Sequence, residues 1–153
     1  MPNQNIGQVD VRGPRFTAWV TTVVLVAALF ASVASYAAAA VVLAAQAVVF
    51  AIGAIGGPRR NPYGRVFAHF IAPRLGPATE TEPVPPLKFA QSVGLFFAVV
   101  GAVAFAIGLG PVGLAATAFA LVAAFLNAAF GICLGCQLYP LVARLRRAPA
   151  PSS

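Results

Sequence analysis

The sequence contains very few charged side chains. Lys and Arg number ten and Asp and Glu three in 153 residues, so charged residues make up 8% of the chain, against about 25% in soluble domains. Hydrophobic residues make up 60%. So few charges cannot cover the surface of a water-soluble globule, and so apolar a chain does not stay disordered. A soluble enzyme and a disordered protein are both excluded, and we expect an integral membrane protein whose surroundings are a lipid bilayer.

Other residue types are just as scarce. Two cysteines exclude a secreted module held together by several disulfides. No Ser-His-Asp set, carboxylate pair or phosphate-binding loop is found, and the apolar runs hold no charge for a proton relay or ion-coupled pump. We therefore expect no cofactor. The net charge of +7 does not indicate nucleic-acid binding, because the aromatic residues lie mostly inside the apolar runs, away from the arginines.

Two long stretches without charge dominate the chain, residues 16–58 and 89–143. A membrane-spanning helix needs about 20 apolar residues, so each stretch accommodates two. Small or turn-forming residues interrupt each stretch near its middle, at 32–36 and 108–113. The runs are continuous rather than alternating, which favours helices over a barrel. The sequence predicts an all-α fold of four transmembrane helices in two hairpins, with spans at 16–34, 37–56, 89–109 and 112–132.

All ten cationic residues fall in three segments: the N-terminus, the loop at 57–88 and the C-terminal tail. With four spans these segments share one side of the membrane, and the positive-inside rule places that side in the cytoplasm. We therefore predict a multi-pass protein of the inner (plasma) membrane with both termini cytoplasmic. Residues 1–147 form one membrane domain and 148–153 a disordered tail. The alternative is that the first apolar stretch, with the small residues 31–34, is a cleaved signal peptide.

The cytoplasmic loop at 57–88 divides into two parts. Asn61 is a good N-cap, Pro62 suits a first helical position, and Pro73 is expected to stop the helix. This short helix either lies in the headgroup plane or packs as an elbow between the hairpins. The second half, Gly76 to Pro86, is predicted to be an extended linker with polyproline character.

The two cysteines form a single Cys-X-X-Cys motif, Cys133 and Cys136, at the end of the fourth predicted span. This spacing permits dithiol–disulfide exchange or sulfur relay through a persulfide. It also supplies half of a metal site, which a partner would have to complete, because zinc and iron–sulfur clusters take about four ligands. The structural alternative is that both are small packing residues. At the C-terminal end of a helix, the dipole would oppose a thiolate.

Gln46, Thr117 and Asn127 are among the uncharged polar residues within the apolar runs. Asn127, shortly before Cys133, is the candidate intramembrane polar site, although most such groups form hydrogen bonds between helices. His69 is expected to be an ordinary loop histidine.

Several short motifs together resemble a known family. They are Arg12-Gly13-Pro14-Arg15, Asn61-Pro62-Tyr63-Gly64, Pro73-Arg74-Leu75-Gly76-Pro77, Phe89-Ala90-Gln91, and Phe125-Leu126-Asn127-Ala128 through Cys136. With them the chain resembles, over nearly its whole length, the actinobacterial integral membrane family known as domain of unknown function 4395. The family brings no established activity. Its members often accompany thioredoxin-like and rhodanese-like proteins, so the resemblance implies a partner of that kind.

These observations lead to two main hypotheses and leave enzymatic activity undecided. In the first, Cys133 and Cys136 exchange electrons or sulfur with a cytoplasmic thioredoxin-like or rhodanese-like protein. In the second, the chain is a non-catalytic membrane scaffold, an oligomer or a subunit of a larger membrane complex. A weaker third hypothesis is a passage for a small sulfur species between the hairpins, lined by Asn127 and the cysteine pair.

Overall fold

The computed structural model describes residues 8–77, 79–131 and 134–147, and four long helices form its body. They are α1 (Arg12–Ala34), α2 (Tyr36–Gly56), α5 (Val84–Ala106) and α6 (Gly110–Phe130). Each is long and apolar enough to cross a membrane. The predicted all-α fold with four such helices is confirmed, and the chain is a multi-pass membrane protein.

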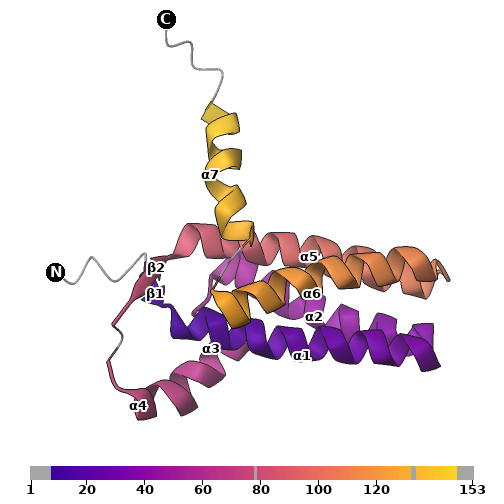
Figure 1. The fold of residues 1–153 in the computed structure, drawn as a ribbon, viewed down its shortest axis with the longest axis horizontal. Coiled ribbons are helices and arrows are strands. Elements are labelled where there is room, and N and C mark those ends of the chain that lie inside the picture. The colour runs from indigo at the N-terminus through magenta and orange to yellow at the C-terminus, as the bar shows by residue number, and fades with distance from the viewer. Residues whose placement is uncertain (1–7, 78, 132–133, 148–153) are drawn as a thin grey trace, which may run out of the picture.

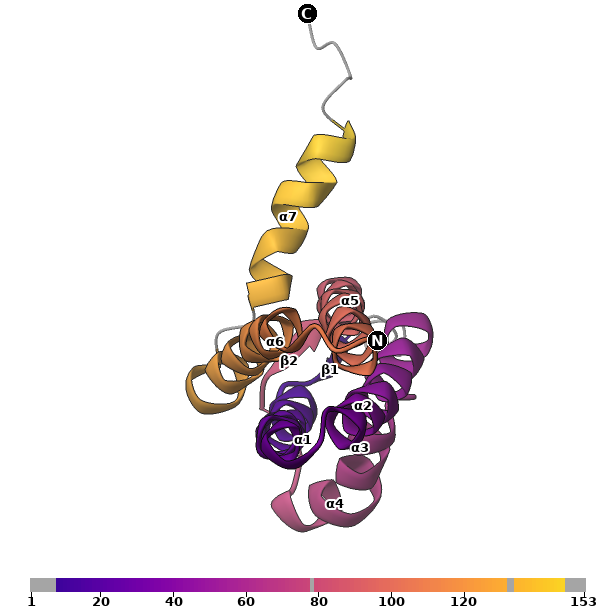
Figure 2. The same cartoon turned by 90° about the vertical axis from the view of Figure 1, so that its right-hand side faces the viewer.

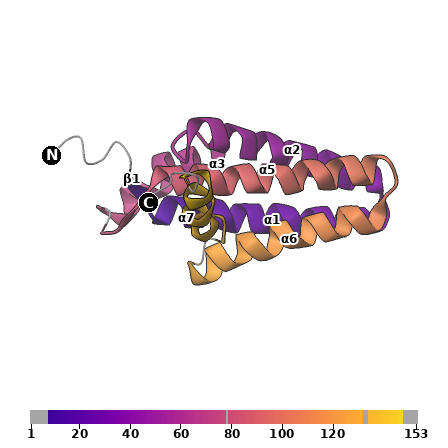
Figure 3. The same cartoon turned by 90° about the horizontal axis from the view of Figure 1, so that it is seen from above.

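The four helices run side by side as a bundle (Figures 1 and 3). Viewed along the bundle, α1, α2, α5 and α6 follow one another around its axis, and each packs against its two neighbours (Figure 2). The turns that join α1 to α2 and α5 to α6 lie together at one end, and the start of α1, the end of α6 and the long connection lie at the other (Figure 3). The predicted arrangement of two hairpins is therefore the one observed.

Small residues fill most of the interior, and large apolar side chains cover much of the outside. Leu25, Leu43 and Phe105 are the large members of the main buried cluster, where alanines surround them. By contrast, Phe30 is 73% exposed and Val33 86% exposed. Such a distribution suits a bundle surrounded by lipid, in which small residues let helices approach closely.

The connection between α2 and α5 is helical for longer than predicted. It consists of α3 (Pro62–Val66), a π-helical turn η2 (Phe67–Ile71) and α4 (Ala72–Leu75). Asn61 caps α3 by accepting a hydrogen bond from the Tyr63 N–H at 2.9 Å, as expected of an N-cap. Pro73 does not stop the helix, so that prediction is wrong. The π turn just before it widens the backbone, and Pro73 occupies the first turn of α4, where an N–H is not needed.

The second half of the connection is also more ordered than a polyproline linker. Strand β2 (Thr81–Pro83) pairs antiparallel with β1 (Gln8–Asp10), with Val9 opposite Glu82. Helix α5 then begins at Val84, and Pro85 and Pro86 lie in its first turn, where proline is tolerated. The polyproline prediction is wrong for these residues, and the predicted disordered tail at 148–153 lies outside the described residues.

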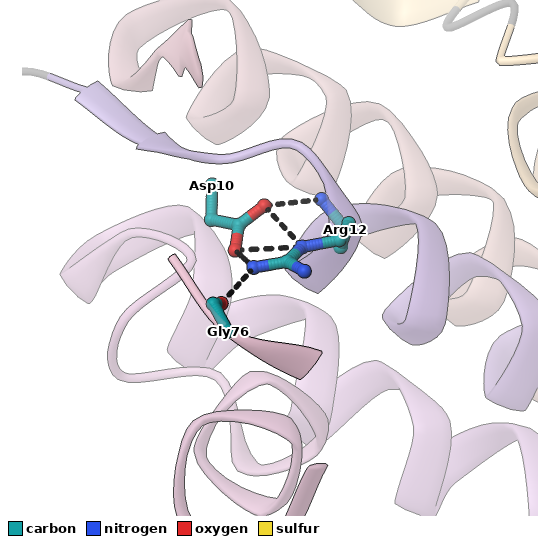
Figure 4. Close-up of polar contacts among 3 residues, drawn as sticks. All are labelled: Asp10, Arg12 and Gly76. Atoms are coloured by element: carbon teal, nitrogen blue, oxygen red, sulfur yellow. Dashed lines mark hydrogen bonds and ion pairs between the residues drawn. The ribbon is translucent and has the colours of Figure 1, made fainter. Parts of the chain in front are cut away.

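An ion pair fixes the N-terminal strand to this connection. The Asp10 carboxylate accepts hydrogen bonds from the Arg12 backbone N–H at 3.0 Å and from its guanidinium at 2.6 Å. Arg12 Nη2 also donates to the Gly76 carbonyl at 3.0 Å, so one guanidinium joins β1 to the residue after α4 (Figure 4). The side-chain hydrogen bond from Arg12 lowers the pKa of Asp10 below its usual 3.8.

We expect Asp10→Asn to lower the thermal unfolding midpoint in detergent at pH 7 by about 1–3 °C, the order for one partly exposed ion pair. A carboxyl whose pKa is lowered by folding stabilises the fold above its unfolded value. That contribution is lost as the pH falls through the lowered pKa. The midpoints of the wild type and the variant should therefore converge once the pH has fallen below the lowered pKa of Asp10. Glu80→Gln, which removes an exposed carboxylate nearby, is the control, and equal effects of the two variants at pH 7 would contradict the prediction.

Candidate functional site

The Cys-X-X-Cys motif is predicted at the end of the fourth long helix, but Cys136 lies in the first turn of a separate helix. Helix α6 ends at Phe130, and Gly131 follows with φ 72°, its N–H donating to the Asn127 carbonyl at 3.0 Å. Cys133 lies outside the described residues. Helix α7 (Leu134–Arg147) begins directly after it in sequence and holds Cys136 in its first turn. The predicted position is corrected because a left-handed glycine ends α6 before the motif is reached.

The partial charge of the helix end at Cys136 is therefore opposite in sign to the one predicted. The N-terminal end of a helix carries partial positive charge and stabilises anions, whereas the C-terminal end opposes them. Cysteines at helix N-termini are therefore placed favourably for reaction as thiolates. The predicted position of Cys136 is the unfavourable end of a helix, whereas its position in the structure is the favourable end.

Helix α7 leaves the side of the bundle crosswise to the four long helices (Figures 1 and 2). It packs on α5, with the Tyr139 ring 5.9 Å from that of Phe89. Leu138, Leu141 and Leu145 share one face and are between 47% and 66% exposed. The helix contains arginines but no acidic residue. It is therefore amphipathic, with an apolar face that the bundle leaves largely uncovered.

Arg15 connects α1 to the end of α6 just before the motif. Its Nη2 donates to the Ala128 carbonyl at 3.1 Å and approaches that of Ala129 at 3.5 Å. A guanidinium at the C-terminal end of a helix satisfies free carbonyls and interacts favourably with the dipole. This contact fixes the segment that carries Asn127.

A cavity of about 270 Å³ lies between α1, α2, α5 and α6 near the end of the bundle from which α7 leaves. Asn127 lines it, and so does Leu138 of α7. The Asn127 side chain forms no hydrogen bond with any residue in the described ranges, so the expected bond between helices is not found there. The candidate polar residue thus borders a cavity.

A hydrogen-bonded amide pair borders the same cavity. Asn61 Nδ2 donates to Gln91 Oε1 at 3.0 Å and so joins the start of α3 to α5. Asn61 is 1% exposed. Gly53 of α2 lies directly beneath this pair, and a methyl group there would overlap Gln91 Oε1 and stand 2.9 Å from Asn61 Nδ2. The pair exists because α2 presents no side chain at this point.

A second polar contact holds the connection onto the bundle. Tyr63 Oη donates to Gln46 Oε1 at 2.8 Å. Gln46 is 1% exposed, and its Nε2 has no hydrogen-bond partner among the residues that the structure describes. Burial raises the pKa of Tyr63, so the phenol stays protonated and can donate. Gln46 is thus bonded to the connection rather than to another span.

Sequence reasoning found Asn127 but missed the other polar groups of the cavity. Thr17 and Thr21 of α1 also line it and are 6% and 3% exposed. Gln91 was noted only as part of a family motif, and Asn61 as a helix cap. A threonine in an apolar run does not by itself indicate a polar site, because its hydroxyl often donates a hydrogen bond to a backbone carbonyl of its own helix. Thr117 does so here, donating to the Gly113 carbonyl at 2.8 Å.

Within the described ranges, no three His, Cys, Asp or Glu residues come together as a metal site would require. His69 lies in the π turn and is exposed. Cys133 and its immediate surroundings are outside those ranges, so the predicted need for a partner to complete a metal site stays a prediction.

Comparison with known proteins identifies the family but no activity. No curated protein matches the chain, and no solved structure does. The model of one family, described as "Domain of unknown function (DUF4395)", matches residues 9–144. This range covers all four long helices, the connection between the hairpins and most of α7. The chain therefore belongs to the DUF4395 family.

Proposed function

We propose that this protein is a membrane thiol protein that exchanges electrons with a cytoplasmic thioredoxin-like protein through Cys133 and Cys136. One observation carries the proposal: Cys136 lies in the first turn of α7, which begins at Leu134. That is the position at which a helix dipole favours a thiolate, the reactive form of cysteine. A pair at this spacing also keeps a second thiol near the first.

The exchange would proceed through a mixed disulfide. One cysteine thiolate attacks a sulfur of the partner's disulfide, and the partner's other sulfur leaves as a thiolate that takes up a proton. The second cysteine of the pair then loses its proton and attacks the first cysteine's sulfur in the mixed disulfide, and the partner's remaining sulfur leaves as a thiolate that also takes up a proton. The pair ends as a disulfide and the partner as a dithiol, so two electrons and two protons have passed to the partner. The reverse sequence reduces the pair.

The distribution of charge supports a cytoplasmic position for the motif. Among the described residues, the cationic side chains belong to the start of α1, the connection between the hairpins, the start of α5 and α7. All of these lie away from the two hairpin turns (Figure 3). The positive-inside rule assigns this end to the cytoplasm of the inner (plasma) membrane, with both termini there. The crosswise direction of α7 suits an amphipathic helix at that membrane surface.

The test uses the full chain in inside-out membrane vesicles. The pair is oxidised with diamide, which is then removed, and a reduced thioredoxin-type protein is added. A maleimide–polyethylene glycol reagent then counts the free thiols. We expect no label after oxidation, two labels after the partner is added, and an unlabelled Cys133→Ser, Cys136→Ser control. A partner lacking its resolving cysteine should be trapped as a mixed disulfide.

Two results would overturn this proposal. Thiols that stay alkylatable through oxidation, together with double-serine cells indistinguishable from the parent, would favour the scaffold. A persulfide formed from thiosulfate and a rhodanese-type protein, without any disulfide exchange, would assign the pair to sulfur relay instead.

A further inference from the structure

We infer that the cavity between the four long helices binds an uncharged, ring-bearing molecule of the membrane that carries carbonyl or hydroxyl oxygens. Its lining is assembled from all four long helices, the connection and α7. The inference rests on this lining alone and does not depend on the cysteine pair.

The lining excludes ions as ligands. Among the described residues around the cavity there is no Lys, Arg, His, Asp or Glu. A charged ligand buried in such surroundings would lose its hydration without gaining a counter-charge, which is strongly unfavourable. The ligand is therefore uncharged.

The lining nevertheless offers hydrogen-bonding groups that the described protein leaves unused. The hydroxyls of Thr17 and Thr21 have no partner among the described residues, although both residues are more than nine-tenths buried. The Asn127 amide also has no partner among the described residues, and that residue is partly buried. Buried polar groups are normally paired, so a ligand with a carbonyl or hydroxyl oxygen would complete them. A plain hydrocarbon chain would leave them unpaired.

The apolar part of the lining suits a planar ring. Phe50, Phe97 and Phe119 belong to three different helices and all border the cavity. Aromatic rings pack favourably against one another, face to edge or offset. A cavity of about 150 Å³ holds a benzene molecule, so 270 Å³ leaves room for two fused rings. A whole phospholipid is far larger than this volume.

Such a ligand would enter from the bilayer. Phe119 lines the cavity and is also 64% exposed, and Leu138 lines it and is 47% exposed. The cavity thus reaches the outer surface of the bundle beside α6 and α7. A pocket that opens beside lipid-facing side chains is accessible to molecules dissolved in the membrane.

The probe is 2,3-dimethyl-1,4-naphthoquinone, whose blocked ring positions do not alkylate cysteines. Binding to the full chain in nanodiscs is measured by ultrafiltration and absorbance, with empty nanodiscs correcting for partition into lipid. We expect one saturable site per chain, retained in the Cys133→Ser, Cys136→Ser variant. Thr21→Val, which keeps the volume and removes the hydroxyl, should weaken binding about five- to tenfold. Its control is Thr22→Val, because Thr22 bonds the Ala18 carbonyl and does not line the cavity.

A second pair of variants tests whether the probe occupies the volume of the cavity. Ala123 lines the cavity, whereas Ala118 on the same helix is exposed at the lipid-facing surface. Ala123→Phe should abolish the saturable component and Ala118→Phe should leave it unchanged. Absence of saturable binding, or equal affinity of Thr21→Val and Thr22→Val, would overturn the inference. Displacement of the probe by decane would also overturn it, since it would mean that any apolar chain is accepted.

Discussion

Gly53→Ala should destabilise the protein strongly although it adds only one methyl group. The new Cβ would overlap Gln91 Oε1 and stand 2.9 Å from Asn61 Nδ2. The amide pair would have to separate, or α2 and α5 would have to move apart along their tightly packed contact. Overpacking of this kind costs about 1–3 kcal/mol, and buried amides without partners would add to that cost.

Reversible unfolding in mixed micelles measures the effect. The control is Ala44→Val, because Ala44 is exposed and lies nine residues earlier on the opposite face of α2. It should change the free energy of unfolding by less than about 0.5 kcal/mol. Gln91→Ala removes the overlapping atoms, so the double variant should be more stable than Gly53→Ala alone. A Gly53→Ala protein as stable as the wild type would show that the close approach is absent.

The four long helices were predictable because the bilayer leaves the chain few choices. In lipid, backbone N–H and C=O groups have no water to bind and must form hydrogen bonds with one another, so each long uncharged stretch becomes helical. The predicted starts were less accurate, with α1 beginning at Arg12 and α5 at Val84. The first and third predicted spans begin directly after the charged residues Arg15 and Lys88. A helix need not end where the hydrocarbon ends, and proline is acceptable in its first turn.

The position of the cysteine motif was predictable in principle from one residue. Gly131 follows the apolar run of α6, and glycine just after a helix commonly ends it. The prediction carried the helix to residue 132 because the charge-free stretch continues beyond it. Absence of charge does not distinguish a membrane-spanning helix from a separate amphipathic one. Most of α7 lies within the charge-free stretch, yet α7 is a separate helix.

The cavity was not predictable from the sequence. Asn61 and Gln91, which both line it, lie thirty residues apart, and only the packing of the connection onto the bundle brings them together. Asn127 was found because an amide in an apolar run is conspicuous. Thr17 and Thr21 become distinctive only when their hydroxyls are known to lack partners among the residues that the structure describes.

The second large effect is expected at Phe105, near the opposite end of the bundle. Its side chain is 1% exposed, packs within the main buried cluster and lies 5.3 Å from the Tyr36 ring. Phe105→Ala should lower the free energy of unfolding by about 2–4 kcal/mol. Lipid is as apolar as this interior, so most of the loss comes from packing rather than from transfer to water.

The same site should show strong coupling with Gly113 of α6. A methyl group on Gly113 would stand 2.9 Å from three atoms of the Phe105 ring. Gly113→Ala alone should therefore be destabilising, although alanine favours helix over glycine by about 1 kcal/mol. In the Phe105→Ala background the ring is gone, and the same methyl group enters the vacated space. There Gly113→Ala should become stabilising.

Unfolding of the four proteins in a double-mutant cycle gives the coupling free energy directly. We expect a coupling of at least about 1 kcal/mol, with a change of sign in the effect of Gly113→Ala. Additive effects would mean that the ring does not occupy the space above Gly113. A sign change would show that one glycine sets the distance between α5 and α6, because only a missing side chain lets the Phe105 ring lie flat against the neighbouring helix.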